Sequence, residues 1–172
     1  MENSLKRKIL PLTLAIVVIV LDQITKMLVV NNIPLGTIGA SFLGDFFQII
    51  HVANKGVAFS MGSSWSQNIR ALAFIFVPLI VVILVIHIYF RNKDFTKLQR
   101  WTIMGTVGGG IGNLIDRIFR PTGVVDFIDI KFYGFLGFNR WPTFNIADAA
   151  IVICGIILAI SFLRSVSNSK EE

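Results

Sequence analysis

The chain has little of what holds secreted and metal-binding proteins together. Its 172 residues include one cysteine, Cys154, and two histidines, His51 and His87. A single cysteine excludes an internal disulfide framework. A zinc peptidase is not expected, because the sequence does not supply zinc ligands together and no His-Glu-x-x-His segment occurs. The serine-hydrolase turn Gly-x-Ser-x-Gly is absent as well.

Charged residues are also scarce. They make up 15% of the chain while 54% is hydrophobic, and the mean hydropathy is +0.73, which is far too apolar for a soluble domain of this size. The net charge of +6 is carried in short segments between apolar runs and not along one amphipathic face. This distribution indicates topology signals beside anionic lipid headgroups, and no nucleic-acid partner is expected.

Four apolar runs of membrane-spanning length dominate the sequence. They cover about 9–30, 69–90, 101–119 and 144–163. The third run is the weakest because it contains many glycines. Its Gly105/Gly109 and Gly108/Gly112 pairs have the small-xxx-small spacing that lets membrane helices pack closely. The sequence therefore predicts a membrane all-α bundle of four transmembrane helices, with residues 1–172 forming a single polytopic domain.

Basic residues flank these runs unequally. They precede the first run, lie between the second and third runs, and follow the fourth run. Both termini are therefore expected to be cytoplasmic, with the segments 31–68 and 120–143 outside. These outer segments are rich in aromatic, β-branched and glycine residues, which predicts a small extracytoplasmic β-rich subdomain. Within it, residues 44–62 predict a hairpin that turns at 54–56.

Acidic residues inside the predicted spans are the strongest functional signal. Counted at 1.5 Å per residue from the cytoplasmic boundary, Asp22 lies roughly 20 Å along its span, and Asp116 and Asp148 lie roughly 22 Å along theirs. Carboxylates at this depth are costly to bury and mark functional sites. Asp22 and Lys26 share one helix face and are expected to pair, whereas Asp116 and Arg117 point apart and need separate partners.

Two neighbouring carboxylates could carry out hydrolysis. One keeps a proton and polarises a carbonyl, while the other takes a proton from water, as in aspartic proteases. The second outer segment brings Asp126 and Asp129 toward the layer of Asp148, which could thus pair with Asp116, Asp126 or Asp129. The residues alone leave these pairings open. A helix N-terminus favours the ionised form of Asp148, and apolar surroundings favour a protonated Asp126.

Five short motifs resemble those of the signal peptidase II family of bacterial membrane aspartic peptidases. In chain order they are DQITK at 22–26, NKGVAFS at 54–60, GGGIGNLIDR at 108–117, VVDFID at 124–129 and FNIAD at 144–148. Their order, over nearly the whole chain, makes the resemblance specific. In that family the catalytic pair lies in the VVDF and FNxAD motifs. The resemblance therefore implies that Asp126 and Asp148 share a catalytic water.

The resemblance also implies roles for the residues around this pair. Those expected to shape the site or bind substrate are Asn54, Gly56, Asn113, Arg117 and Asn145. Those expected to act as structural polar supports are Asp22, Lys26, Asp116 and Asp129. Neither a metal nor another cofactor is implied.

The family's activity implies the expected substrate and location. Its members remove signal peptides from diacylglyceryl-modified prolipoproteins, cutting before the lipidated cysteine. They do so in the bacterial cytoplasmic (inner) membrane, near the outer leaflet. The expected partners are such precursors, membrane lipid and the inhibitor globomycin, and the enzyme is expected to be a monomer.

Two functions from other classes are weighed against this one. A small ion- or proton-coupled transporter would also use intramembrane carboxylates, but no inverted repeat is visible, and the charges lie in the outer third of the spans. A non-catalytic assembly partner packed through the glycine-rich helix would leave Asp126 and Asp148 without a role. Cleavage of a lipidated precursor would separate the peptidase from both.

Overall fold

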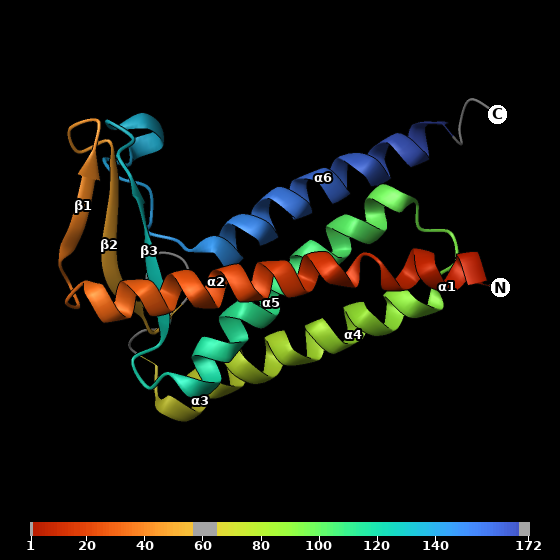
Figure 1. Cartoon of the computed structure of the whole chain (residues 1–172), viewed down its shortest axis with the longest axis horizontal. Helices are drawn as coiled ribbons and strands as arrows, with labels where there is room; N and C mark the ends of the chain where they lie inside the picture. Colours follow the sequence, from red (N-terminus) through yellow and green to blue (C-terminus); the bar gives the residue numbers. More distant parts are fainter. Residues whose placement is uncertain (1, 57–64, 169–172) are drawn as a thin grey trace.

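Long helices run alongside one another, and a small sheet lies across one end of them (Figure 1). The computed structural model describes residues 2–56 and 65–168. The helices are α1 (Glu2–Ile9), α2 (Leu12–Asn32), α3 (Gln67–Ala71), α4 (Val77–Arg91), α5 (Lys97–Phe119) and α6 (Ile146–Asn168). A π-helical turn, η2 (Leu72–Phe76), joins α3 to α4, and a short 3-10 turn, η3 (Phe135–Gly137), precedes α6. Each predicted apolar run coincides with one of the long helical stretches.

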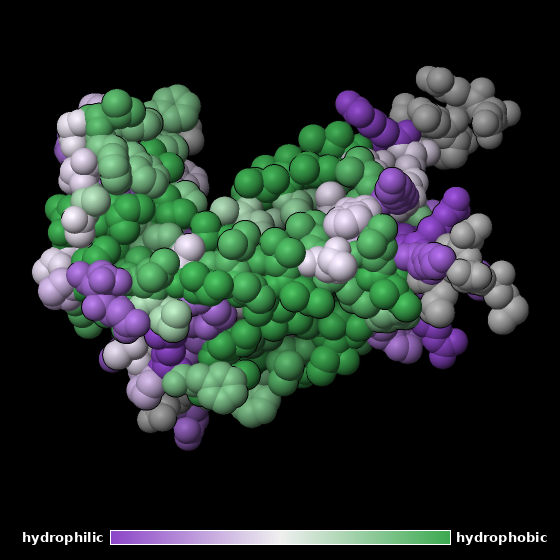
Figure 2. All heavy atoms as spheres, viewed as in Figure 1, coloured by the Kyte–Doolittle hydropathy of each residue, from purple (hydrophilic) through white to green (hydrophobic). Residues whose placement is uncertain are grey.

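Within the described residues, three helical stretches are long and apolar enough to cross a membrane. They are Lys6–Asn32, Leu72–Arg91 and Ile146–Ser165. Hydrophobic residues cover the face of the bundle that Figure 2 shows, and hydrophilic residues gather toward its ends. α5 is not among these stretches. It packs against α2, α4 and α6 and buries side chains along its whole length, so it has less contact with the surroundings of the bundle. A helix that contacts other helices in place of lipid tolerates glycine and polar residues.

The glycines of α5 bring its neighbours close, as their spacing predicts. A Cβ on Gly108 would lie 2.8 Å from the backbone of Ala15 in α2. A Cβ on Gly109 would overlap the backbone carbonyl of Ala147 in α6. Cys154 is half-buried on α6. α5 is thus the helix around which α2 and α6 are assembled.

Gly109→Ala is expected to lower the stability of the fold by roughly 1–3 kcal/mol, because the new methyl group has to push α6 away. Gly155→Ala on α6 is the matched control, since a Cβ there would meet no atom of the described residues within 4 Å. Alanine has the higher helix propensity, so this variant should gain up to about 1 kcal/mol. Thermal unfolding of both purified variants in detergent provides the comparison. Equal melting temperatures would contradict the close approach of α5 and α6.

The sheet contains three antiparallel strands in the order β1 (Ile38–Phe42), β2 (Phe47–Asn54) and β3 (Val124–Ile130). β1 and β2 are joined by a tight turn in which Leu43 and Gly44 have positive φ angles of 51° and 72°. The predicted β-rich subdomain is present, and β3 places Asp126 opposite Val52 of β2.

The hairpin predicted for residues 44–62 is only partly described. Its first arm is β2, and β2 pairs with β1 on one side and β3 on the other. Its expected second arm, 57–62, lies outside the described residues. At the expected turn the Asn54 side chain accepts a hydrogen bond from the Gly56 backbone N–H at 3.0 Å. This bond bends the chain at the end of β2, as asparagine side chains do in turns.

Candidate active site

A capping box at the start of α6 fixes the position of Asp148. The Asn145 side-chain oxygen accepts a hydrogen bond from the Asp148 backbone N–H at 2.9 Å. In return, the Asp148 carboxylate accepts one from the Asn145 backbone N–H at 3.2 Å. Such reciprocal bonds satisfy two backbone donors at a helix N-terminus. The FNIAD segment therefore begins a helix and orients its aspartate with the same contacts.

Asn145 also connects α6 to β3. Its oxygen is held by the capping bond, so its NH₂ group is free to donate, and it does so to Asp126 Oδ1 at 2.7 Å. The other oxygen of Asp126 accepts a hydrogen bond from Asn54 Nδ2 at 2.9 Å. Asn145 is fully buried and Asp126 is 3% exposed. A single asparagine thus contacts both members of the expected catalytic pair.

Asn113 of α5 is oriented in a similar way. Its side-chain oxygen accepts hydrogen bonds from Lys26 Nζ and Asn145 Nδ2, both at 3.1 Å. Because a cation and an amide N–H both donate to that oxygen, the NH₂ group must point the other way. It donates to Asp148 Oδ1 at 2.7 Å. The buried lysine therefore sets which end of Asn113 faces Asp148.

Lys26 lies at the centre of a fully buried ionic network. Its Nζ is 2.8 Å from Asp22 Oδ2 and 2.9 Å from Asp116 Oδ2, and all three side chains have 0% exposure. With Asn113, the ammonium group has three acceptors for its three N–H bonds. Asp116 also pairs with Arg120 at 2.9 Å, so two carboxylates are balanced by two cations. The predicted pairing of Asp22 with Lys26 is confirmed.

The network also attaches the two elements that carry Asp126 and Asp148. Asp22 Oδ1 accepts a hydrogen bond from the Ala147 backbone N–H in the first turn of α6, at 3.0 Å. Asp116 Oδ2 accepts one from the Val125 backbone N–H, next to Asp126, at 3.1 Å. Asp22, Lys26 and Asp116 thus hold β3 and α6 at a fixed separation. The support role that the resemblance implies for them stays a prediction.

Asp129 does not join this cluster, although the second outer segment was expected to bring it there together with Asp126. The two residues are three positions apart on β3, and side chains alternate between the faces of a strand, so they point to opposite sides. Asp129 forms an ion pair with Arg140 instead. Arg140 also donates to Gln48 Oε1 at 2.9 Å. Asp129 therefore supports the far face of the sheet.

The acidic residues of this end of the molecule fall into two groups. Asp116 and Asp129 are neutralised by ion pairs. Asp126 and Asp148 contact only amide donors in the parts of the chain that the structure describes. Burial raises the pKa of Asp126 to about 7, and the charge of Asp148 raises it too, against the hydrogen bonds from Asn54 and Asn145. Of the three pairings left open by the sequence, this contrast favours Asp126 with Asp148.

A cavity of about 550 Å³ opens beside these two carboxylates. Its polar wall contains Asn54, Asn113, Arg117, Asp126 and Asp148. Its apolar wall is formed by Val124, Trp141, Pro142, Phe144, Ile151, Val152 and Ile153. Because Val152 and Ile153 of α6 are each 57% exposed, the apolar wall continues onto the outer surface of the helix bundle. The cavity can therefore hold a polar group at one end and a hydrocarbon chain at the other.

Three partners in these networks are not found by sequence reasoning. Gln23 donates to the carboxylates of Asp22 and Asp116, each at 3.2 Å. Arg120 lies four residues after Asp116, a spacing that could have predicted their ion pair. Arg140 is distant in sequence from the residues it binds, so only the folded sheet shows its role. The reciprocal Asn-x-x-Asp capping pattern at residue 145 was also readable from the sequence.

Helices of membrane-spanning length and a buried polar site with a cavity fit a membrane enzyme. A family model described as "Signal peptidase (SPase) II" matches residues 14–164. The chain therefore belongs to the signal peptidase II family.

Individual relatives agree with this assignment. The lipoprotein signal peptidase of Treponema pallidum (strain Nichols) is 53% identical over 159 residues, which are 92% of this chain and 86% of that protein. The lipoprotein signal peptidase of Treponema denticola is 45% identical over 169 residues, which are 98% of this chain and 97% of that protein. A solved structure described as a bacterial membrane enzyme superimposes with a TM-score of 0.79 at 27% identity, covering 94% of this chain and 92% of that one.

Proposed function

We propose that this chain is a lipoprotein signal peptidase that works as an aspartic endopeptidase. It removes the signal peptide from a diacylglyceryl-modified prolipoprotein by cutting before the lipidated cysteine. The observation that carries the proposal is the arrangement of Asp126 and Asp148 around Asn145, which donates to one through its side chain and to the other through its backbone. Cleavage of a purified lipidated precursor by the purified chain tests it.

The proposed reaction uses one water held between the two carboxyl groups. Asp148 takes a proton from the water while the water oxygen attacks the scissile carbonyl carbon. Asp126 donates its proton to the carbonyl oxygen. The C–N bond then breaks. The leaving amine takes the proton from Asp148, and the hydroxyl of the tetrahedral intermediate returns one to Asp126. Both groups end in their starting states.

The form of the cavity supports a lipid-modified substrate. Its polar wall can receive the peptide bond next to the dyad, while the apolar wall leads to the exposed surface of α6 at Val152 and Ile153. A diacylglyceryl group can stay in contact with hydrocarbon along this wall, which avoids the cost of drawing it into water. Arg117 and Asn54, both half-buried in the polar wall, are proposed to bind the peptide backbone. Globomycin is expected to occupy the same cavity.

The pH dependence of cleavage should report the proton on Asp126. Its pKa is raised to about 7, so the proton-donating form predominates below that pH and is lost as the pH rises through it. The value of kcat/KM should therefore fall about tenfold per pH unit above the midpoint. A profile of kcat/KM from pH 5 to 9 gives the midpoint, with Asp45→Asn as the control because that carboxylate is exposed on the sheet. A profile that stays flat through pH 9 would remove Asp126 as the acid.

The membrane arrangement is proposed to contain four transmembrane helices in one polytopic domain, with α5 as the fourth. Both termini lie in the cytoplasm, and the sheet lies outside, so the dyad is near the outer leaflet. A cysteine introduced at Leu43, which is 83% exposed, should react with a membrane-impermeant maleimide in intact cells, and one at Lys93 should not. Labelling of both positions, in a Cys154→Ser background, would contradict this topology. The enzyme is proposed to act as a monomer.

A further inference from the structure

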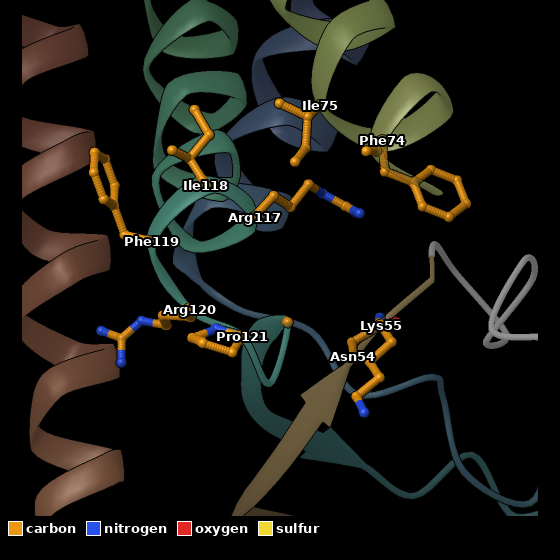
Figure 3. A pocket seen from close by; sticks show the side chains of 11 residues that line it. Asn54, Lys55, Phe74, Ile75, Arg117, Ile118, Phe119, Arg120 and Pro121 are labelled. Atoms are coloured by element: carbon orange, nitrogen blue, oxygen red, sulfur yellow. The ribbon is translucent and has the colours of Figure 1, made fainter. Parts of the chain in front are cut away.

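A second cavity, of about 520 Å³, shares Asn54 and Arg117 with the cavity beside the dyad (Figure 3). Its remaining walls come from Phe74 and Ile75 of η2, the end of α5, and the turn that leads into β3. None of its described lining residues is acidic. This distinguishes it from the active-site cavity, which contains two carboxylates.

The positive charge of this cavity is not cancelled by its own walls. Figure 3 shows the Arg117 guanidinium extending toward Phe74, whereas Arg120 points away toward α2. Arg120 is occupied by its ion pair with Asp116. Arg117 donates to the Gly56 backbone carbonyl at 3.0 Å and lies 5.1 Å from the centre of the Phe74 ring, and it forms no ion pair within residues 2–56 and 65–168.

The wall opposite Arg117 has an unusual backbone. η2 is a π-helical turn of five residues between α3 and α4, and such turns are rare and concentrate at functional sites. This turn buries Phe74, which is 8% exposed, beneath the guanidinium of Arg117. Lys55 lies at the rim and is exposed to solvent. A cation held over an aromatic ring, with a second cation at the entrance, is a suitable place for an anion.

The surroundings of the cavity are those of a lipid boundary. Phe119 lines it and is 75% exposed, and Leu72 and Phe76, which adjoin lining residues in sequence, are 61% and 54% exposed. Leu72 also begins one of the stretches that are long enough to cross a membrane. An anion that binds here must therefore tolerate hydrocarbon on one side and cations on the other. That combination is the chemistry of a phosphate group attached to acyl chains.

We propose that this cavity binds the phosphate of an anionic phospholipid headgroup through Arg117 and Lys55, next to the dyad but apart from it. The binding does not depend on the proposed peptidase activity. A free inorganic phosphate would present the same charge without the acyl chains.

Native mass spectrometry of the full chain in detergent tests this site. Phosphatidylglycerol is titrated against phosphatidylcholine with identical acyl chains, and phosphatidylglycerol should bind more tightly. Arg117→Gln should weaken phosphatidylglycerol binding roughly tenfold or more, and Lys55→Gln roughly fivefold. Lys131→Gln is the matched control, because Lys131 is a partly exposed cation of the sheet that pairs with Asp45, and it should change nothing. If Arg117→Gln does not fold, phosphatidylglycerol binding by Lys55→Gln is compared with binding by Lys131→Gln, and this comparison alone tests the site.

Each other outcome overturns the proposal. Equal binding of the two lipids, or equal loss in Lys55→Gln and Lys131→Gln, would show that no built anion site exists here. Inorganic phosphate can make the same charge-assisted contacts without acyl chains. Displacement of the lipid by inorganic phosphate at about 10 mM would therefore assign the cavity to free phosphate. Because bound mass is the readout, these results stand apart from whether the chain cleaves anything.

Discussion

Asp126→Asn and Asp148→Asn are each expected to lower kcat/KM for a diacylglyceryl-modified precursor roughly 10³-fold or more. Asparagine has nearly the same shape as aspartate, and its one oxygen can still accept one of the two hydrogen bonds that each carboxylate receives. What is lost is the ability to take a proton from water or to donate one to the carbonyl. Gel-resolved cleavage in detergent provides the rate, and substrate binding should be preserved.

The double variant is expected to be hardly worse than either single one, because the two groups act as a unit. Asp45→Asn is the matched control, since it makes the same substitution at a carboxylate that is 50% exposed and paired with Lys131. Its rate should stay within about twofold of the parent, as expected for an exposed ion pair. Substantial turnover by a folded Asp126→Asn or Asp148→Asn chain would contradict the proposed dyad.

Lys26→Met is expected to destabilise the fold by roughly 3–5 kcal/mol, the usual cost of removing one member of a buried ion pair. The substitution leaves Asp22 and Asp116, both with 0% exposure, without the cation that lies between them. Since these carboxylates attach α6 and β3 to the bundle, the loss should separate Asp148 from Asp126 as well as lower stability. The melting temperature in detergent should fall by roughly 10 °C.

The control for this change is Lys131→Met, which removes an exposed cation from its pair with Asp45 and should cost at most about 1 kcal/mol. Asp22→Asn should likewise give less folded protein. If Asp22→Asn has the melting temperature of the parent chain but no turnover, Asp22 belongs to the chemistry, and its assignment as a structural support is wrong.

The helices could be predicted from the sequence because their cause is local. Each depends on a long apolar run, and the structure places a long helical stretch at every run. Asp22 and Lys26 were predictable for the same reason, since four residues along a helix bring two side chains onto one face. Glycine spacing predicted close packing of α5, although not which helices it would contact.

The arrangement of the sheet depends on contacts between distant segments, which periodicity does not reveal. The sequence predicted a hairpin turn at Asn54 to Gly56. It did not predict that β2 pairs with β3, which comes from residues 124–130. Asp129 was expected near Asp148. Because side chains alternate between the two faces of β3, Asp129 points to the opposite face and pairs with Arg140. The choice of Asp126 rested on a family resemblance, because the ion pair of Asp116 with Lys26 of another helix appears only once the chain is folded.

The most direct test of the peptidase proposal is the mass of the products formed from one defined precursor. The purified chain and its Asp126→Asn variant are each incubated with a precursor that carries diacylglyceryl on its cysteine, and the peptides are identified by mass spectrometry. The parent chain should yield the free signal peptide and a product that begins with the lipidated cysteine, and the variant should yield neither. No cleavage by the parent chain, cleavage at another bond, or equal cleavage by the folded variant would contradict the proposal.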